Sequence, residues 1–405
     1  MKSTRTSSTS NATVPNPGLH PERAARLLTV LQSEIDSKRL PGAVAMIVRH
    51  GKVAMFESLG QQNPADASSM ALDSIFRIYS MTKPIVSVAV LMLMEQGKLL
   101  LSDPVGKYLP EYAKQQLATE IDGKVSDTTV TRSATVQDLL RHTAGLTYEF
   151  LGNSAVQKAY RNSKIGMSLR DATNAEFSQT LAALPLQFEP GTMWEYSRAT
   201  DVLGALVEVV TGQTLSDFLT QHIFKPLKMH ETGFSVPTEN HHRLAEPFKH
   251  DPDGGIQLRL INIKEAPKFE SGGGGLASTA QDYARFLQFM LNKGELDGIR
   301  LLSSHTVDYM TADHLGDIPV NRAGASGDLL PPGHGFGLGF AVRTATGISA
   351  VPGSAGVYYW GGIAGTTFFV DPKLDMFAIL MIQAPNQRDY YRPLFRSLVY
   401  AALEE

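Results

Sequence analysis

The chain is predicted to fold as a mixed α/β protein, with one domain built from both ends and a mostly helical domain inserted between them. Strand-like runs lie near both termini, and helical patterns dominate the segment between them. A length of 405 residues fits two or three domains, or one large domain with a long insertion. We expect residues 18–82 and 273–405 to form the mixed domain and residues 83–272 the helical one.

The N-terminal elements follow from composition and side-chain periodicity. Residues 1–17 are polar and rich in Ser and Thr, which predicts a disordered tail. Apolar residues at helical spacing over 21–38 predict a helix. The runs Ala43–Val48 and Val53–Glu57 are strand-like, and the intervening Arg-His-Gly-Lys predicts that they form a hairpin.

Helical patterns continue through the middle of the chain. The apolar run Pro84–Met94 predicts a buried helix. Further helices are predicted at Val136–Leu140, Phe177–Leu184, Val202–Val210 and Leu215–His222. Near the C-terminus the pattern predicts strands at Gly339–Arg343, Thr366–Val370 and Met376–Ile382, then a helix over Tyr391–Leu403.

Composition argues against several classes of partner. The chain is 43% hydrophobic and 19% charged, with a net charge of -3 and no basic block, so nucleic acid and membrane surfaces are not expected partners. The absence of cysteine excludes disulfides and thiol chemistry. Ser271–Gly275 lacks the ending of a phosphate-binding loop. Because no secretory apolar core or bilayer-length segment is present, we expect a cytoplasmic protein.

The tetrapeptide Ser80-Met81-Thr82-Lys83 opens the apolar helix and carries the main chemical signal. A spacing of three places Ser80 and Lys83 on one helix face, one turn apart. A serine hydroxyl is a poor nucleophile and needs a neighbour that takes its proton. Lysine can do so if burial moves its pKa from about 10.4 to near 7, which costs about 4.6 kcal/mol. Alone, the motif also fits a helix-capping serine followed by a solvated lysine.

Two later segments add to the signal of the Ser80–Lys83 motif. Tyr196 lies in the turn-like segment Phe188–Arg198, and Trp360-Gly361-Gly362 precedes a strand. In this order, the three segments resemble the serine β-lactamase and penicillin-binding-protein superfamily. More specifically, the chain resembles the class C β-lactamase-like branch and, within it, the family VIII carboxylesterases. The resemblance spans roughly residues 20–400 and includes the marker segments Leu100–Pro110, Leu139–Leu146 and Gly273–Thr279.

The resemblance implies an antiparallel sheet flanked by helices and a role for each matching position. Ser80 is the implied nucleophile and Lys83 its activating partner. Tyr196 matches the tyrosine of the Tyr-x-Asn motif, where cationic or dipolar neighbours can lower its pKa from about 10. Either Lys83 or Tyr196 can then be the base. The amides of Ser80 and Ile363 form the implied oxyanion hole. His142, in a marker segment, is interpreted as structural.

Two positions depart from the family pattern. Trp360 stands where β-lactamases and transpeptidases carry a lysine that binds the substrate carboxylate. An indole has no charge, so we expect the substrate-binding residues Trp360, Gly361 and Gly362 to favour neutral esters. Arg198 stands at the asparagine of Tyr-x-Asn. It is either a surface arginine or a residue that holds Tyr196 or a substrate carbonyl.

We therefore expect a serine carboxylesterase that hydrolyses short-chain acyl esters through an acyl-enzyme on Ser80. A small-molecule ester is the expected partner, with no cofactor and no metal. A β-lactamase, a D-amino-acid peptidase or an acyltransferase of the same fold remains an alternative, and the sequence leaves the oligomeric state open. A non-catalytic penicillin-binding-like scaffold would require Ser80, Lys83 and Tyr196 to be vestigial. The chain lacks the G-x-S-x-G elbow of α/β-hydrolases.

Overall fold

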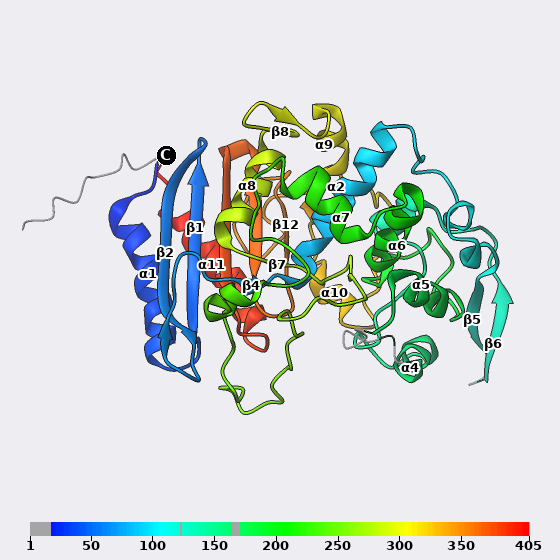
Figure 1. The fold of residues 1–405 in the computed structure, drawn as a ribbon, viewed down its shortest axis with the longest axis horizontal. Helices are drawn as coiled ribbons and strands as arrows, with labels where there is room; N and C mark the ends of the chain where they lie inside the picture. The colour runs from blue at the N-terminus through cyan, green and yellow to red at the C-terminus, as the bar shows by residue number, and fades with distance from the viewer. Residues whose placement is uncertain (1–17, 122–123, 164, 166–170, 405) are drawn as a thin grey trace, which may run out of the picture.

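The computed structural model describes residues 18–121, 124–163, 165 and 171–404, so the predicted tail at 1–17 lies outside the described residues. An eight-stranded antiparallel sheet forms one side of this described part (Figure 1). Its strands, in spatial order, are β10 (His334–Phe336), β11 (Ala341–Arg343), β12 (Tyr358–Gly361), β13 (Thr367–Asp371), β14 (Met376–Ile382), β1 (Gly42–Arg49), β2 (Lys52–Asn63) and β3 (Ser68–Ser69).

The N- and C-terminal parts of the chain meet inside this sheet. Strand β1 pairs with β14 antiparallel, with Ala45 opposite Leu380. On its other side β1 pairs with β2, which confirms the predicted hairpin. The connecting residues His50 and Gly51 have φ angles of 53° and 67°, and positive φ at both central residues matches the twist of a tight hairpin. One sheet is thus assembled from both ends of the chain, as predicted.

The two faces of β1 bury different helices, because side chains alternate along a strand. Ala43, Ala45 and Ile47 pack in one cluster with α1 (Pro21–Asp36) and α11 (Arg388–Ala402). The alternate residues Val44, Met46 and Val48 belong to a larger core that includes α2 (Thr82–Glu95) and α8 (Ala280–Leu291). Helices therefore cover both faces of the sheet (Figure 1).

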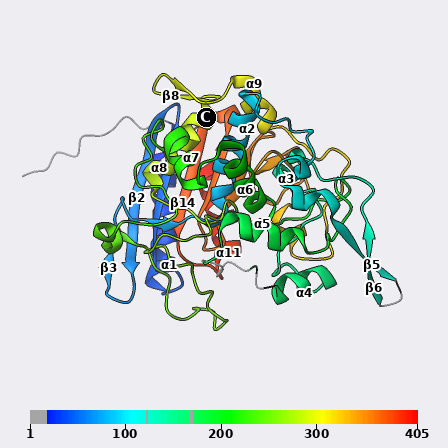
Figure 2. The ribbon, with the colours of Figure 1, turned by 45° about the vertical axis from the view of Figure 1, so that its right-hand side comes forward.

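The helical part lies beside the sheet, as Figure 2 shows from a second side. Its α3, α5 and α6 coincide closely with the predicted segments, and the predicted helix at 215–222 forms α7 followed by a π-helical turn, Thr220–Phe224. Threonine side chains cap the first turns of α3 and α5, which explains where those helices begin. The helices are α3 (Val136–Leu140), α4 (Ala155–Asn162), α5 (Asn174–Ala182), α6 (Ala199–Thr211), α7 (Leu215–Leu219), α9 (Ser304–Met310) and α10 (Ser326–Leu329).

Several elements differ from the sequence expectation. A polar hairpin, β5 (Gln116–Ile121) and β6 (Lys124–Thr129), projects from the predicted helical region. Two further pairs of short strands, β4 (Phe76–Arg77) with β7 (Ala277–Ser278) and β8 (Glu295–Leu296) with β9 (Ile299–Arg300), were also not predicted. Among the described residues, no single helix is long and apolar enough to cross a membrane. Only α6 and the segment Leu215–Phe224, taken together, reach that length and apolarity, and the two are bent by 81° relative to each other. The boundaries near 82 and 272 stay a prediction.

Candidate active site

Ser80 and Lys83 lie side by side at the start of α2. Ser80 is the middle residue of a 3₁₀ turn, Tyr79–Met81, and Lys83 lies in the first turn of α2. Lys83 Nζ is 3.2 Å from Ser80 Oγ. The Ser80 side chain caps no helix and Lys83 is fully buried, so the alternative of a capping serine with a solvated lysine is wrong.

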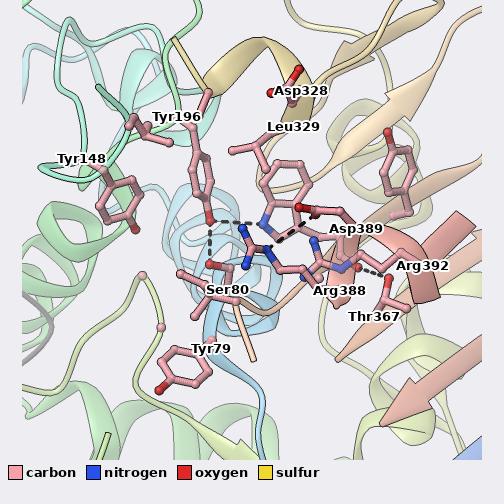
Figure 3. Close-up of a pocket in the computed structure, with 18 of the residues that line it drawn as sticks. Tyr79, Ser80, Tyr148, Tyr196, Asp328, Leu329, Thr367, Arg388, Asp389 and Arg392 are labelled. Atoms are coloured by element: carbon pink, nitrogen blue, oxygen red, sulfur yellow. Dashed lines mark hydrogen bonds and ion pairs between the residues drawn. The ribbon is translucent and has the colours of Figure 1, made fainter. Parts of the chain in front are cut away.

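The backbone just before the serine is in an unusual conformation. Tyr79 has φ of 44°, a left-handed value that is rare for a bulky residue. Its hydroxyl accepts a hydrogen bond from Ile261 N–H at 2.8 Å, and burial raises its pKa to about 12. Strained backbone of this kind persists where the surrounding contacts hold it, often at functional sites. Here it brings Ser80 to the cavity wall (Figure 3).

The Lys83 ammonium is in an environment that favours its neutral form. Burial lowers the pKa of Lys83 to about 7, with Asp201 opposing the shift and Arg198 adding to it. Besides Ser80, Nζ contacts the Gly273 carbonyl oxygen at 2.6 Å and the Tyr148 hydroxyl at 3.0 Å. A neutral amine has two donors and one lone pair. It can donate to Gly273 and Tyr148 and accept the proton of Ser80.

Tyr196 is a second group that contacts the serine, and its ring centroid lies 4.6 Å from Lys83 Nζ. Its hydroxyl is 2.6 Å from Ser80 Oγ and receives a hydrogen bond from Trp360 Nε1 at 3.3 Å. The predicted lowering of the tyrosine pKa is wrong. Burial raises the pKa of Tyr196 above its usual value, and the hydrogen bonds of Ser80 and Trp360 and the charge of Arg392 offset this only in part. The Tyr196 hydroxyl is therefore protonated at neutral pH, whereas the pKa of Lys83 lies near neutral pH.

Arg198 is not on the surface. Only 2% of its surface is exposed, so the interpretation as a surface arginine is wrong. It forms ion pairs with Glu149 at 2.6 Å and Asp201 at 3.4 Å, and its guanidinium lies 4.7 Å from the ring centroid of Tyr148. Among the described residues it makes no hydrogen bond to Tyr196. A role in binding substrate stays a prediction, although Arg198 does line the cavity.

Arg198 belongs to a chain of contacts that leads back to Lys83. Asp201 Oδ1 accepts a hydrogen bond from Gly273 N–H at 2.9 Å, and Gly273 O is the 2.6 Å partner of Lys83. Tyr148 links Arg198 to Lys83 from the other side. Sequence reasoning missed the functional positions of Tyr148, Asp201 and Gly273. The signals available were the marker segment just before Tyr148, the marker segment that begins at Gly273, and the acidic residue at the start of the predicted helix after Arg198.

His142 packs behind the site. Its ring lies 5.0 Å from that of Tyr196, and Nδ1 is 2.9 Å from Ser197 Oγ. Burial, together with the charge of Lys83, holds the pKa of His142 well below its usual value. A neutral, buried histidine without contact to Ser80 agrees with the structural interpretation.

Three of the four predicted substrate-binding residues, Arg198, Trp360 and Gly361, line one cavity of about 740 Å³, whereas Gly362 is not among its lining residues. Trp360 and Gly361 end β12, and Ile363 follows on the loop to β13. The backbone of Gly362 lies too close to that of Ile78 for a side chain, since a Cβ there would be 2.4 Å from Ile78 O. Ser80, Tyr148, Tyr196, Arg198, Trp360, Gly361, Ile363 and Arg392 are among the residues that line the cavity.

Comparison with known proteins places this site in a family. The family model described as Beta-lactamase matches residues 27–401. Esterase EstB of Burkholderia gladioli is 34% identical over 378 residues, which cover 88% of this chain and 90% of that protein. Lovastatin esterase of Penicillium rubens is 29% identical over 382 residues, covering 88% and 92%. The solved structure "EstCE1, a hydrolase with promiscuous acyltransferase activity" has a TM-score of 0.80 at 29% identity, covering 94% of this chain and 99% of that chain.

These matches confirm the resemblance inferred from the three motifs, including the antiparallel sheet with flanking helices. They extend over nearly the whole described chain, and one residue from each motif, Ser80, Tyr196 and Trp360, lines the same cavity. The chain belongs to the Beta-lactamase family, and its fold is that of the serine hydrolases of this superfamily.

Proposed function

We propose that this protein is a serine carboxylesterase that hydrolyses short-chain acyl esters through an acyl-enzyme on Ser80. One observation carries the proposal: Ser80 Oγ lies 3.2 Å from the buried Lys83 Nζ and 2.6 Å from Tyr196 OH, at the wall of a large cavity. A nucleophile, a proton acceptor and a proton donor thus lie within reach of one ester carbonyl. Relatives named as esterases support the same chemistry.

The proposed cycle assigns one role to each group. Neutral Lys83 takes the Ser80 proton as Oγ attacks the ester carbonyl carbon. The amides of Ser80 and Ile363 stabilise the resulting oxyanion. The proton passes through Tyr196 to the leaving alcohol, and the C–O bond breaks to leave the acyl-enzyme. Water then attacks the acyl carbonyl carbon and gives a proton to Lys83. The bond between that carbon and Ser80 Oγ breaks, the carboxylic acid leaves, and Lys83 returns the proton to Ser80 Oγ.

Trp360 supports a neutral ester as the substrate rather than a β-lactam. The indole is 5% exposed and uses its N–H on Tyr196, so it offers substrate an apolar surface and no positive charge. A carboxylate-bearing lactam would find no lysine at this position. The indole therefore serves both to hold Tyr196 and to select substrate.

Acyl transfer to an alcohol other than water is a second candidate. The relative EstCE1 is described as a hydrolase with promiscuous acyltransferase activity. A cavity of about 740 Å³ is large enough to hold an acyl group and an acceptor alcohol together. Product analysis with added short alcohols separates the two activities, since transfer yields a new ester in place of the acid.

The test is a substrate panel with matched serine variants. It contains p-nitrophenyl esters from acetate to laurate, nitrocefin and a D-alanyl amide, each assayed with wild type, Ser80→Ala and Ser87→Ala. Ser87 lies on the same helix and is buried, and its hydroxyl makes no hydrogen bond to the other described residues. We expect Ser80→Ala alone to abolish ester hydrolysis. Absence of turnover of every substrate by wild type would instead support a non-catalytic scaffold.

A further inference from the structure

An arginine from the C-terminal helix contacts the peptide group behind the predicted oxyanion hole. Arg392, on α11, donates a hydrogen bond from Nη2 to the carbonyl oxygen of Gly362. The carbonyl of Gly362 and the N–H of Ile363 belong to the same peptide unit. The donor proposed to stabilise the oxyanion therefore lies at one end of this peptide, and the guanidinium holds the other end. Figure 3 shows Arg392 at the cavity that also contains Ser80 and Tyr196.

The glycines of the Trp-Gly-Gly segment make this contact possible. A Cβ on Gly361 would lie 2.8 Å from both Cζ and Nε of Arg392 and from Thr366 O. The absence of a side chain at Gly361 therefore lets the guanidinium lie close to the end of the strand. Gly362 N–H donates to Thr366 O at 2.8 Å, which fixes the near side of the same turn. The Gly362 carbonyl also accepts a hydrogen bond from Gly365 N–H at 2.9 Å, so two donors hold the peptide between Gly362 and Ile363 at its carbonyl oxygen.

The charge on Arg392 is not used by a carboxylate. Arg392 takes part in none of the ion pairs found between described residues, and its Nε–H is buried without a hydrogen-bond partner there. Burial, together with the charge of Arg388, lowers the pKa of Arg392 to about 10. The group is still a cation at neutral pH. Arg392 as a whole is half-buried, and a charged arginine held there with a buried, unpaired Nε–H is costly for a purely structural brace.

We propose that Arg392 is a positioning residue for the oxyanion hole, acting through the Gly362–Ile363 peptide. A charged donor on a peptide carbonyl polarises the amide, which makes its N–H a stronger donor. The same contact holds Ile363 N–H in place before the reaction, so no reorganisation is needed when the oxyanion forms. This inference rests on the proposed Ser80 acyl transfer and assigns Arg392 no contact with the substrate.

The test compares Arg392→Gln and Arg392→Lys with a matched control, Arg49→Gln. Arg49 also donates to backbone carbonyls, those of Gly18 and Glu404, but lies outside the cavity. We expect Arg392→Gln to lower kcat/KM for p-nitrophenyl butyrate and the inactivation rate by a p-nitrophenyl phosphonate by similar factors of about ten to a hundred. Arg392→Lys should restore part of both rates, because a cation can still reach the carbonyl. Arg49→Gln should leave both unchanged.

A spectroscopic measurement separates this role from bracing of the fold. In an acyl-enzyme carrying a ¹³C=O label, the carbonyl stretch reports how strongly the oxyanion hole polarises the ester. We expect that stretch to move to higher frequency in Arg392→Gln and to return toward the wild-type value in Arg392→Lys. If Arg392→Gln does not fold, Arg392→Lys alone tests the proposal. Its carbonyl stretch should then lie at a higher frequency than that of wild type.

Three results would overturn the proposal. One is a wild-type carbonyl stretch and wild-type phosphonate reactivity in a folded Arg392 variant. Another is a loss of rate that follows a lowered Tm, with an unchanged stretch, which indicates a brace. A third is a loss confined to esters that carry a carboxylate, which indicates an anion-binding arginine. Failure of the proposed function itself is distinct, because wild type and Arg49→Gln would then also lack ester hydrolysis.

Discussion

At the scale of single residues, the site depends on how two buried groups respond to the same desolvation. Burial disfavours the charged form of each group, so it lowers the pKa of Lys83 to about 7 and raises that of Tyr196. The amine becomes a usable base and the phenol stays a proton donor. These opposite shifts assign proposed acid and base roles to two side chains that both contact Ser80.

The first prediction concerns those two residues together. Lys83→Ala and Tyr196→Phe should each lower kcat by at least about a hundredfold, the scale for positioned acid and base groups. The double variant should be little worse than either single variant, because both act on one proton path. Steady-state kinetics with p-nitrophenyl acetate measures this. Single effects that multiply in the double variant would mean that the residues serve separate steps.

A second residue-scale prediction concerns Trp360. Trp360→Lys should raise the ratio of nitrocefin to ester turnover about ten- to a hundredfold, since a charge-assisted hydrogen bond to the lactam carboxylate contributes about 1.5 to 3 kcal/mol. The ester rate should fall, because Tyr196 loses the indole N–H. Circular dichroism and thermal melting must first show a folded variant, as loss of a buried indole costs stability. A folded variant with an unchanged ratio would show that position 360 does not respond to substrate charge.

At the scale of elements, α2, α6 and the Gly-rich segment are tied together around Lys83. Arg198 and Asp201, at the start of α6, bind each other within a buried network, and Asp201 holds Gly273 N–H. Gly273 O in turn holds Lys83 on α2. The arginine that departs from the Tyr-x-Asn pattern thus acts at a distance. It helps to set the position and charge balance of the lysine through its neighbours.

The third prediction tests that network through the pH dependence of activity. Only neutral Lys83 can accept the serine proton, so kcat/KM should rise with pH through about 7 in wild type. Asp201 stabilises the ammonium and raises the lysine pKa. Asp201→Asn removes that charge, so the rise should shift to lower pH. The surface variant Asp375→Asn is the control, and a shift to higher pH in Asp201→Asn would contradict the network.

At the scale of the whole molecule, the site lies where the strands of the sheet meet the helical part. Strand β12 supplies Trp360 and Gly361, α2 supplies Lys83, and the turn before α6 supplies Tyr196. The cavity between them is lined largely by aromatic and aliphatic side chains. Because both the acyl group and the alcohol must fit there, substrate size is set by the packing of sheet against helices.

The fourth prediction therefore concerns chain length. Activity on p-nitrophenyl esters should peak at C2 to C6 acyl chains, since longer chains must share the cavity with the alcohol. It should show no interfacial activation, because no lid-like amphipathic segment is evident in the sequence. Rates measured from acetate to laurate, below and above the solubility limit, check this. A preference for long-chain triglyceride emulsions would contradict it.

Local sequence patterns predicted the elements that support the site. Elements α1, α2, α6 and β14 were predicted because their apolar residues recur at helical or strand spacing. The three motifs placed Ser80, Lys83, Tyr196 and Trp360 around one site, because their order is specific to a superfamily. The β5–β6 hairpin was missed, since its two strands, QLATEI and KVSDTT, are mostly polar and together lack a regular apolar alternation.

What the sequence could not predict are contacts between distant positions. Lys83 meets Tyr148 and Gly273, which lie 65 and 190 residues away, and Arg392 meets Gly362 across 30 residues. Such contacts depend on how elements pack, and no local period reports them. The same holds for the direction of the Tyr196 pKa shift. Proximity to a lysine suggested a lowering, whereas the degree of burial, a property of the whole fold, reverses it.

The most direct test of the proposed chemistry is to label the nucleophile covalently and locate the adduct. Wild type and Ser80→Ala are treated with a fluorophosphonate and digested, and the modified peptide is sequenced by tandem mass spectrometry. We expect one stoichiometric adduct on Ser80, no adduct in Ser80→Ala, and a loss of esterase activity in proportion to labelling. An adduct on another serine, or full ester hydrolysis by folded Ser80→Ala, would contradict the assignment of Ser80 as the nucleophile.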